Sequence, residues 1–143
     1  MIELTAKFAG AKWLKGITMP TSVEVLGIGC LDNTGLTTLT IPATIKKFNY
    51  GIKECDSLKV VTIESTEVTL DFQLQRSSIE TLSLPVRLAK MEKFALEGCN
   101  KLKKIVVPTK RSNYYKKRLP EELWGLIVEQ EPEEKPRKKT SNK

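Results

Sequence analysis

The sequence predicts a mostly β repeat solenoid, in which one short strand-and-turn unit is stacked on copies of itself. Three observations support this fold class: a seven-residue frame recurs five times, its spacing is nearly constant, and proline ends four of the five copies. The frames begin at Leu14, Leu36, Leu58, Ile79 and Leu102, at intervals of 22, 22, 21 and 23 residues. Residues 14–108 are therefore expected to form one continuous stack.

Each frame contains a segment that is typical of a short, half-buried strand. In the second frame, residues 37–41 alternate polar and apolar side chains and are rich in β-branched residues. Pro42 then ends the strand, because proline has no N–H to donate to a neighbouring strand. The third frame has Glu64 in place of the proline. We interpret that repeat as degenerate.

The bulky apolar residues at positions one, four and six of each frame are predicted to form the core. Strands stacked about 4.8 Å apart align these positions into continuous columns, and each buried side chain contributes roughly 1.5–3 kcal/mol. A further apolar residue follows at the tenth position of the repeats, as Val23, Ile45, Leu88 and, one place late, Val68. A second apolar set then leads to the next strand, with Phe48, Tyr50 and Ile52 in one repeat and Met91, Phe94 and Leu96 in another.

A tight return is expected three residues before each new frame, at Asn33, Cys55, Arg76 and Cys99. A small polar side chain at such a return can meet backbone groups that have no strand partner. Cys30 aligns with apolar residues of other repeats and is expected in the core. Cys55 and Cys99 lie two turns apart, which is too far for a disulfide. The sequence therefore predicts three free, mostly buried thiols.

The residue types exclude several kinds of chemistry. The chain has no histidine, which removes the commonest general base and the commonest metal ligand. The three cysteines lack a CxxC spacing, so no zinc site or thioredoxin-like motif is predicted. We expect no cofactor and no enzymatic activity.

Net charge is distributed unevenly along the chain. Residues 1–100 carry 11 basic and 11 acidic side chains, whereas residues 101–118 carry eight basic side chains and no acidic one. The eight are Lys101, Lys103, Lys104, Lys110, Arg111, Lys116, Lys117 and Arg118. One end of the molecule is therefore expected to be strongly basic.

The recurring frame and the segment that precedes it resemble those of a known family. The pattern L-x-x-L-x-I-P, an apolar residue three places later, and the segment 95–102 (ALEGCNKL) resemble the BspA-like leucine-rich repeats of bacterial surface and secreted proteins. The resemblance implies a right-handed leucine-rich-repeat coil, here of about five turns, and a module for binding or adhesion without an active site. It covers roughly residues 14–108.

The segment after Pro108 is similar to the C-terminal cap of that family. A short helix around residues 112–118 and a final strand near Ile127 are expected there. Trp124 and the Ile127–Val128 pair are expected to cover the open apolar end and to extend the sheet. We divide the chain into an N-terminal partial repeat or cap (1–13), the repeats (14–108), the C-terminal cap (109–130) and a disordered tail (131–143).

Two columns of outward-facing residues are the first candidate binding surface. If the strands line a concave sheet, one column holds Gly16, Thr38, Val60, Thr81 and Lys104, and the other holds Thr18, Thr40, Thr62, Ser83 and Val106. Such sheet faces are the usual binding surface of solenoids, although threonine also simply suits a parallel sheet. The partner-binding candidates are Thr18, Thr38, Thr40, Thr62, Thr81, Ser83 and Lys104.

The basic end is the second candidate. It can be a solvated cap, a docking site for an acidic protein, or a nucleic-acid contact in which Tyr114 and Tyr115 stack on bases. No known nucleic-acid-binding motif is present. The predicted function is protein–protein recognition or adhesion, with electrostatic nucleic-acid binding as the alternative and a glycan as a further candidate partner.

The N-terminal region gives expectations for the cellular location of the protein and for its assembly. No apolar run approaches the ~18 residues needed to cross a bilayer, and residues 1–10 do not resemble a signal peptide. We expect a cytoplasmic protein as the sequence stands, or a surface or secreted one if a leader has been removed. The N-terminal residues begin mid-repeat, so a homodimer through that exposed edge is also predicted.

Overall fold

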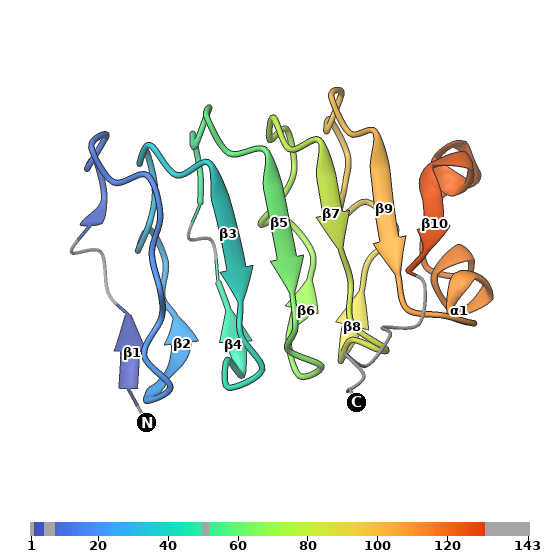
Figure 1. Ribbon diagram of the computed structural model, residues 1–143, viewed down its shortest axis with the longest axis horizontal. Coiled ribbons are helices and arrows are strands. Elements are labelled where there is room, and N and C mark those ends of the chain that lie inside the picture. Colours follow the sequence, from blue (N-terminus) through green and yellow to red (C-terminus); the bar gives the residue numbers. More distant parts are fainter. Residues whose placement is uncertain (1, 5–7, 50–51, 131–143) are drawn as a thin grey trace, which may run out of the picture.

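The computed structural model describes residues 2–4, 8–49 and 52–130, which wind into a parallel β solenoid of about six turns (Figure 1). The elements are β1 (Ile2–Leu4), β2 (Val23–Leu26), β3 (Thr38–Ile41), β4 (Lys47–Phe48), β5 (Val60–Ile63), β6 (Thr69–Leu70), β7 (Thr81–Ser83), β8 (Lys90–Met91), β9 (Lys104–Val107), helix α1 (Ser112–Lys116), the 3-10 helix η2 (Glu121–Leu126) and β10 (Ile127–Glu129). The predicted mostly β solenoid, its parallel sheet and its short C-terminal helix are confirmed, but the solenoid has about six turns instead of the expected five.

The main sheet has five strands in the order β10-β9-β7-β5-β3, all parallel. Figure 1 shows them side by side along the length of the molecule. Burial alternates along each strand, because successive side chains point to opposite faces of a sheet. The fourth and sixth frame positions face inward and are buried as predicted: Leu39, Ile41, Val61, Ile63, Leu82, Leu84, Ile105 and Val107.

The first frame does not form the strand that the sequence predicts. Residues 13–20 have no regular secondary structure, and Leu14, Ile17 and Met19 are only partly buried against the core. This frame belongs to the outermost turn, so it has a neighbouring turn on one side only. The backbone N–H of Thr37 still donates to the carbonyl of Lys15 at 3.1 Å. The fifth strand of the sheet is instead β10, at the other end.

A second ladder of short strands lies behind the main sheet, and sequence reasoning missed it. It consists of a three-stranded sheet, β1-β2-β4, and a two-stranded sheet, β6-β8. The tenth-position residues Val23, Ile45, Val68 and Leu88 are buried near these strands. The ladder is interrupted between β4 and β6, which coincides with the one-residue displacement of Val68 in the sequence.

The second apolar set is confirmed for most of its members. Phe48, Ile52, Met91 and Leu96 are buried. The prediction is wrong for Phe94, whose side chain is 38% exposed and stacks on the ring of Phe72 at the surface. Tyr50 and the tail 131–143 lie outside the described residues.

The tight returns are built mainly by the backbone. A residue with positive φ recurs in successive turns, at Asn33 (59°), Glu54 (60°), Arg76 (60°) and Gly98 (79°). The N–H of Asn33 donates to the carbonyl of Lys53 at 2.8 Å, and that of Arg76 to Glu97 at 2.9 Å. The return therefore needs a left-handed conformation that asparagine and glycine adopt readily, and only some turns supply those residues.

Cysteine side chains do meet backbone groups at two of the returns, as predicted. The Sγ atom of Cys55 donates to the carbonyl of Leu31 at 3.2 Å. Cys99 makes the equivalent bond to Leu74 at 3.0 Å. All three thiols are free and buried. The predicted three free, buried cysteines are confirmed.

In the third repeat, which has Glu64 at the proline position, the side chain of Ser65 closes the turn. Ser65 is fully buried, and its Oγ atom donates to the carbonyl of Ile45 at 2.5 Å and accepts from the N–H of Glu67 at 3.1 Å. In the second repeat, by contrast, the N–H of Ile45 closes a turn on the carbonyl of Pro42. The turn closed by the Ser65 side chain thus stands where the second repeat has a turn that begins at Pro42.

The C-terminal cap closes the last turn only partly with the side chains predicted, of which Ile127 packs against the core. β10 extends the main sheet by pairing with β9, as expected. However, Trp124 is 38% exposed, and the residues that fill the end of the core are Tyr115 and Leu119, both almost fully buried. The Tyr115 hydroxyl donates to the carbonyl of Pro85 at 2.6 Å. This bond joins helix α1 to the preceding turn.

Candidate binding surface

The two predicted columns exist on the outward face of the main sheet. The strand registers place Thr38 beside Val60, Val60 beside Thr81, and Thr81 beside Lys104. The second column runs Thr40, Thr62, Ser83 and Val106 by the same registers. These eight side chains are exposed or half-exposed, and we call them the sheet face.

The column does not reach the first frame as predicted. Thr18 is exposed but lies in the irregular segment 13–20, and Gly16 lies in the same segment. The sheet continues at the opposite end instead, where Val128 of β10 pairs with Val106. Val128 is 43% exposed and extends the second column.

Hydroxyl groups on the sheet face are not used inside the molecule. Within the described chain, the side-chain hydroxyls of these five residues make no hydrogen bond to protein atoms: Thr38, Thr40, Thr62, Thr81 and Ser83. By contrast, Thr34, Ser65 and Thr109 bond to protein atoms elsewhere. The sheet face therefore offers donors and acceptors to an outside partner or to water.

The eight basic residues lie in the last repeat and the C-terminal cap. They fall into two groups, before or at the start of strand β9 and after its end. Lys101, Lys103 and Lys104 lie before or at the start of the strand, and Lys104 also belongs to the sheet face. We call the second group, after the strand, the basic cap: Lys110, Arg111, Lys116, Lys117 and Arg118.

Lys103 is not an unopposed charge. Its Nζ atom lies 3.8 Å from Oε1 of Glu80, and Lys59 lies 3.6 Å from the other oxygen of the same carboxylate. Glu80 and Lys59 precede neighbouring strands of the main sheet at the equivalent position, so stacking of turns brings the three charges together. The order of charges along the sequence did not reveal that Glu80 lies beside Lys103, because Glu80 belongs to the preceding repeat.

Three cationic side chains of the basic cap contact aromatic rings. The Arg118 guanidinium lies 3.6 Å from the centroid of the Tyr114 ring, and its Nη1 donates to the Tyr114 carbonyl at 2.7 Å. Arg111 approaches the same ring at 5.5 Å, and Lys116 lies 5.7 Å from the Trp124 ring. These cation–π contacts hold the cap together.

One of the two tyrosines, Tyr115, is not free to stack on bases. Tyr115 is fully buried, and burial, together with the neighbouring Tyr114, raises the pKa of its hydroxyl well above the usual range. The Tyr114 hydroxyl accepts from the N–H of Leu88 at 3.2 Å. The stacking part of the nucleic-acid hypothesis is therefore wrong for Tyr115.

An acidic residue also lies within the basic cap. Glu129 of β10 accepts a hydrogen bond from the Ser112 hydroxyl at 2.8 Å. Hydrogen bonds from the backbone of Lys110 and from the Ser112 side chain lower the pKa of this carboxyl. Glu129 thereby ties the last strand to the start of α1.

The Cys30 thiol is not a reactive centre. Burial is the main cause that raises the pKa of Cys30 to about 12, and the Asp32 carboxylate adds to it. The thiol is therefore protonated and unreactive near neutral pH. Among the described residues, no group of three or more His, Cys, Asp or Glu side chains is placed to hold a metal ion.

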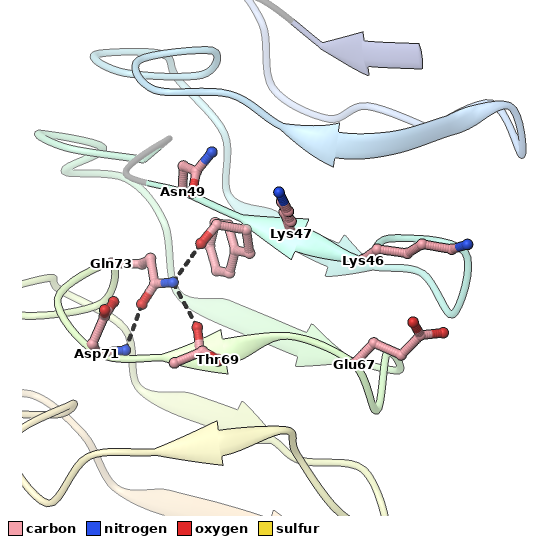
Figure 2. Close-up of a pocket in the computed structure, with 8 residues that line it drawn as sticks. Lys46, Lys47, Asn49, Glu67, Thr69, Asp71 and Gln73 are labelled. Atoms are coloured by element: carbon pink, nitrogen blue, oxygen red, sulfur yellow. Dashed lines mark hydrogen bonds between the residues drawn. The ribbon is translucent and has the colours of Figure 1, made fainter. Parts of the chain in front are cut away.

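A small pocket of about 240 Å³ opens on the back ladder between β4 and β6, and Figure 2 shows the residues around it. The Gln73 side chain reaches across the interruption of the ladder. Its Nε2 donates to the carbonyls of Phe48 and Thr69, and its Oε1 accepts from the N–H of Asp71 at 2.8 Å. Gln73 thus joins β4 to β6 where strand pairing fails, and no sequence signal identified it.

These features define a repeat solenoid with an open sheet face. The family model described as BspA type leucine rich repeat region (6 copies) matches residues 5–74 and 50–119. The two matches together span most of the chain, which therefore belongs to this family. No curated protein and no solved structure shows significant similarity to it. No helix among the described residues is long and apolar enough to cross a membrane.

Proposed function

We propose that the protein is a non-catalytic recognition module that binds a protein partner through the sheet face. The observation that carries this proposal is the state of the five hydroxyl side chains, which lie in register and make no hydrogen bond within the described protein. Family membership supports it, because such repeats generally form protein-binding or adhesion modules.

The geometry suits a broad and shallow contact. Outward residues on adjacent strands lie about 4.8 Å apart, and Val60, Val106 and Val128 add apolar area among the hydroxyls. Lys104 supplies one positive charge at the edge of the same face. A partner with complementary polar groups can satisfy the hydroxyls without any change in the solenoid.

Electrostatic nucleic-acid binding by the basic cap has less support from the structure. Its charges are separated from Lys101–Lys104 by strand β9, Arg118 is engaged by Tyr114, and Tyr115 is buried. A glycan partner on the sheet face stays a prediction, as does a homodimer through β1, which pairs with β2 at the edge of its sheet.

The test compares capture of partners by two matched variants. Thr40→Lys with Ser83→Lys places two bulky charges on the sheet face, on either side of Thr62. Thr21→Lys with Ser22→Lys makes the same change of charge at exposed residues away from the sheet face. Both are used as bait in extracts of the source cells, at low and physiological salt, with nuclease and glycosidase treatment.

The expected result is a protein retained by wild type and by the Thr21/Ser22 variant but lost with the Thr40/Ser83 variant. Retention should survive nuclease and physiological salt. If the Thr40/Ser83 variant retains the same proteins, the sheet face is not the binding surface. If binding disappears with nuclease, the basic cap and nucleic acid become the better explanation, and loss with glycosidase identifies a glycan.

A further inference from the structure

A second surface lies on the edge of the solenoid that follows the short back strands. Ile28, Phe72 and Phe94 occupy equivalent places in three turns, since 44 and 22 residues separate them. Their side chains are 72%, 46% and 38% exposed. Phe72 and Phe94 stack with ring centroids 4.9 Å apart, which matches the distance between adjacent turns. We call these three side chains the apolar strip.

A groove of about 650 Å³ opens beside the apolar strip. Ile28 and Phe72 contribute to its lining, and three carboxylates share it: Asp32, Glu54 and Asp56. Large apolar side chains that are exposed beside acidic groups are unusual on a soluble surface, and such patches often mark interaction sites. The groove therefore combines an apolar wall with an acidic one.

One more carboxylate extends the acidic wall, whereas Asp71, which precedes Phe72, lines the pocket between β4 and β6. Glu97 lies near Phe94, because the Gln75 amide contacts both the Phe94 carbonyl (2.9 Å) and the Glu97 carboxylate (3.5 Å). Within the described chain, none of these four carboxylates belongs to an ion pair; the pairs found are Lys59–Glu80, Lys90–Glu92 and Lys103–Glu80.

The local charge differs in sign from that of the rest of the protein. Four carboxylates (Asp32, Glu54, Asp56 and Glu97) stand against three cationic side chains here (Lys53 and Arg76 in the groove, and Lys93 beside Phe94), which gives −1. The whole chain carries +7, so the remainder carries +8. This edge is therefore complementary to a cationic partner.

We propose that the apolar strip and its carboxylates bind an extended peptide segment in which lysine or arginine alternates with apolar side chains. Ile28 and Phe94 lie three turn-to-turn steps apart, about 14 Å, which equals four or five residues of extended chain; the equivalent position of the turn after Ile28, residue 50, lies outside the described residues. In that conformation alternate side chains point to the same side. Apolar residues can then contact the strip while the intervening cations reach the carboxylates.

Other ligand classes fit this edge less well. Nucleic acids and anionic membranes are repelled by the net negative charge. Phe72 and Phe94 cover one face of each other, with an interplanar angle of 23°.

The experiment titrates the protein with a synthetic dodecapeptide of alternating lysine and leucine, followed by two-dimensional amide NMR. Two control peptides replace lysine with glutamate, or leucine with serine. The test variant is Glu54→Lys with Asp56→Lys, both exposed residues, and a second variant is Ile28→Ser. The matched control, Glu121→Lys with Glu122→Lys, changes the net charge equally on the C-terminal cap, where both glutamates are exposed.

We expect shifts confined to the neighbourhood of Ile28, residues 53–56, 72–78 and 94–97, from the lysine–leucine peptide only. The Glu54/Asp56 variant should weaken binding about tenfold or more, since two attractive contacts become repulsive; Ile28→Ser should also weaken it, and the Glu121/Glu122 variant should not. No binding at millimolar peptide, equal binding by the Glu54/Asp56 and Glu121/Glu122 variants, or shifts on the sheet face would overturn the proposal.

A second copy of the chain is the competing occupant. If wild-type protein self-associates in sedimentation experiments and the Glu54/Asp56 variant does not, this edge binds another copy rather than a cationic peptide. Because the apolar strip and the sheet face are separate surfaces, failure of this proposal leaves the function proposed for the sheet face unaffected.

Discussion

The sheet face and the basic cap lie at neighbouring places in the fold but use their polar side chains in opposite ways. On the sheet face, the hydroxyls of residues such as Thr40 and Thr62 have no protein partner in the described chain. In the basic cap, Arg118 lies on Tyr114, Lys116 approaches Trp124, and the cap also contains the hydrogen-bonded Glu129. A count of charges along the sequence favours the cap as a binding site, whereas the contacts favour the sheet face.

The difference shows what each region contributes. A solenoid must seal its last turn, so cap side chains are needed for folding. The sheet face is already stabilised from behind by the buried columns, so its outward side chains are free to vary. Substitutions in the cap should therefore change stability, and substitutions on the sheet face should change binding alone.

The largest effect is expected at Tyr115. Replacing this fully buried side chain with alanine leaves a cavity at the end of the core and removes the hydrogen bond to Pro85. The free energy of unfolding should fall by about 3–5 kcal/mol, measured by urea denaturation. Tyr115→Phe, which keeps the ring, should cost only about 1 kcal/mol. Equal losses for both variants would show that the ring does not fill the end of the core.

A smaller loss is expected at Arg118. Alanine here removes the cation–π contact with Tyr114 and the hydrogen bond to its carbonyl. The cost should be about 1–2 kcal/mol in the same denaturation experiment. Lys117→Ala is the control, since Lys117 is exposed and carries the same charge. If both variants lose equally, net charge rather than the contact with Tyr114 stabilises the cap.

The hydrogen bond between Glu129 and Ser112 should make the stability of the folded protein depend on pH. The folded-state pKa of this carboxyl lies below its ordinary value of 4.5. Its contribution is therefore complete above about pH 5 and is lost as the pH falls below 4.5 toward the folded-state pKa. The difference in melting temperature between wild type and Glu129→Gln should be constant from pH 7 to about pH 5 and should decrease as the pH falls below 4.5. A difference that stays constant over the whole pH range would contradict the assignment.

The smallest effect is expected on the sheet face itself. Thr40→Val and Thr62→Val remove hydroxyls but keep β-branched side chains of the same shape. Because these hydroxyls have no partner within the described protein, the free energy of unfolding should stay within about 0.5 kcal/mol of wild type. A loss of 1 kcal/mol or more in either variant would mean that the hydroxyl has a structural role.

The repeat frame made the main sheet predictable. Residues such as Leu39, Val61 and Leu82 recur at one position of the frame, and the register of the strands follows directly from that recurrence. The outward columns were predictable for the same reason. The first frame failed because a sequence motif does not reveal whether a turn has neighbours on both sides.

Features that depend on contacts between repeats were not predictable. Glu80 meets Lys103 only because two turns stack, although 23 residues separate them in the chain. Gln73 joins β4 to β6 only where the back ladder is interrupted. The choice of Tyr115 rather than Trp124 as the buried cap residue depends on how α1 packs. The sequence contains both aromatic residues but does not indicate which of them is buried in the cap.

The most direct test of the account is the dissociation constant of a captured protein partner for three forms of the protein. These are wild type, the Thr40→Lys/Ser83→Lys variant of the sheet face and a Lys110→Glu/Arg111→Glu variant of the basic cap. Lys104 is not substituted, because it belongs to the sheet face as well as to the eight basic residues of 101–118. The account predicts affinity about 100-fold weaker, or about 2.7 kcal/mol, for the sheet-face variant and unchanged for the cap variant. Unchanged affinity for the sheet-face variant, with loss in the cap variant, would contradict it.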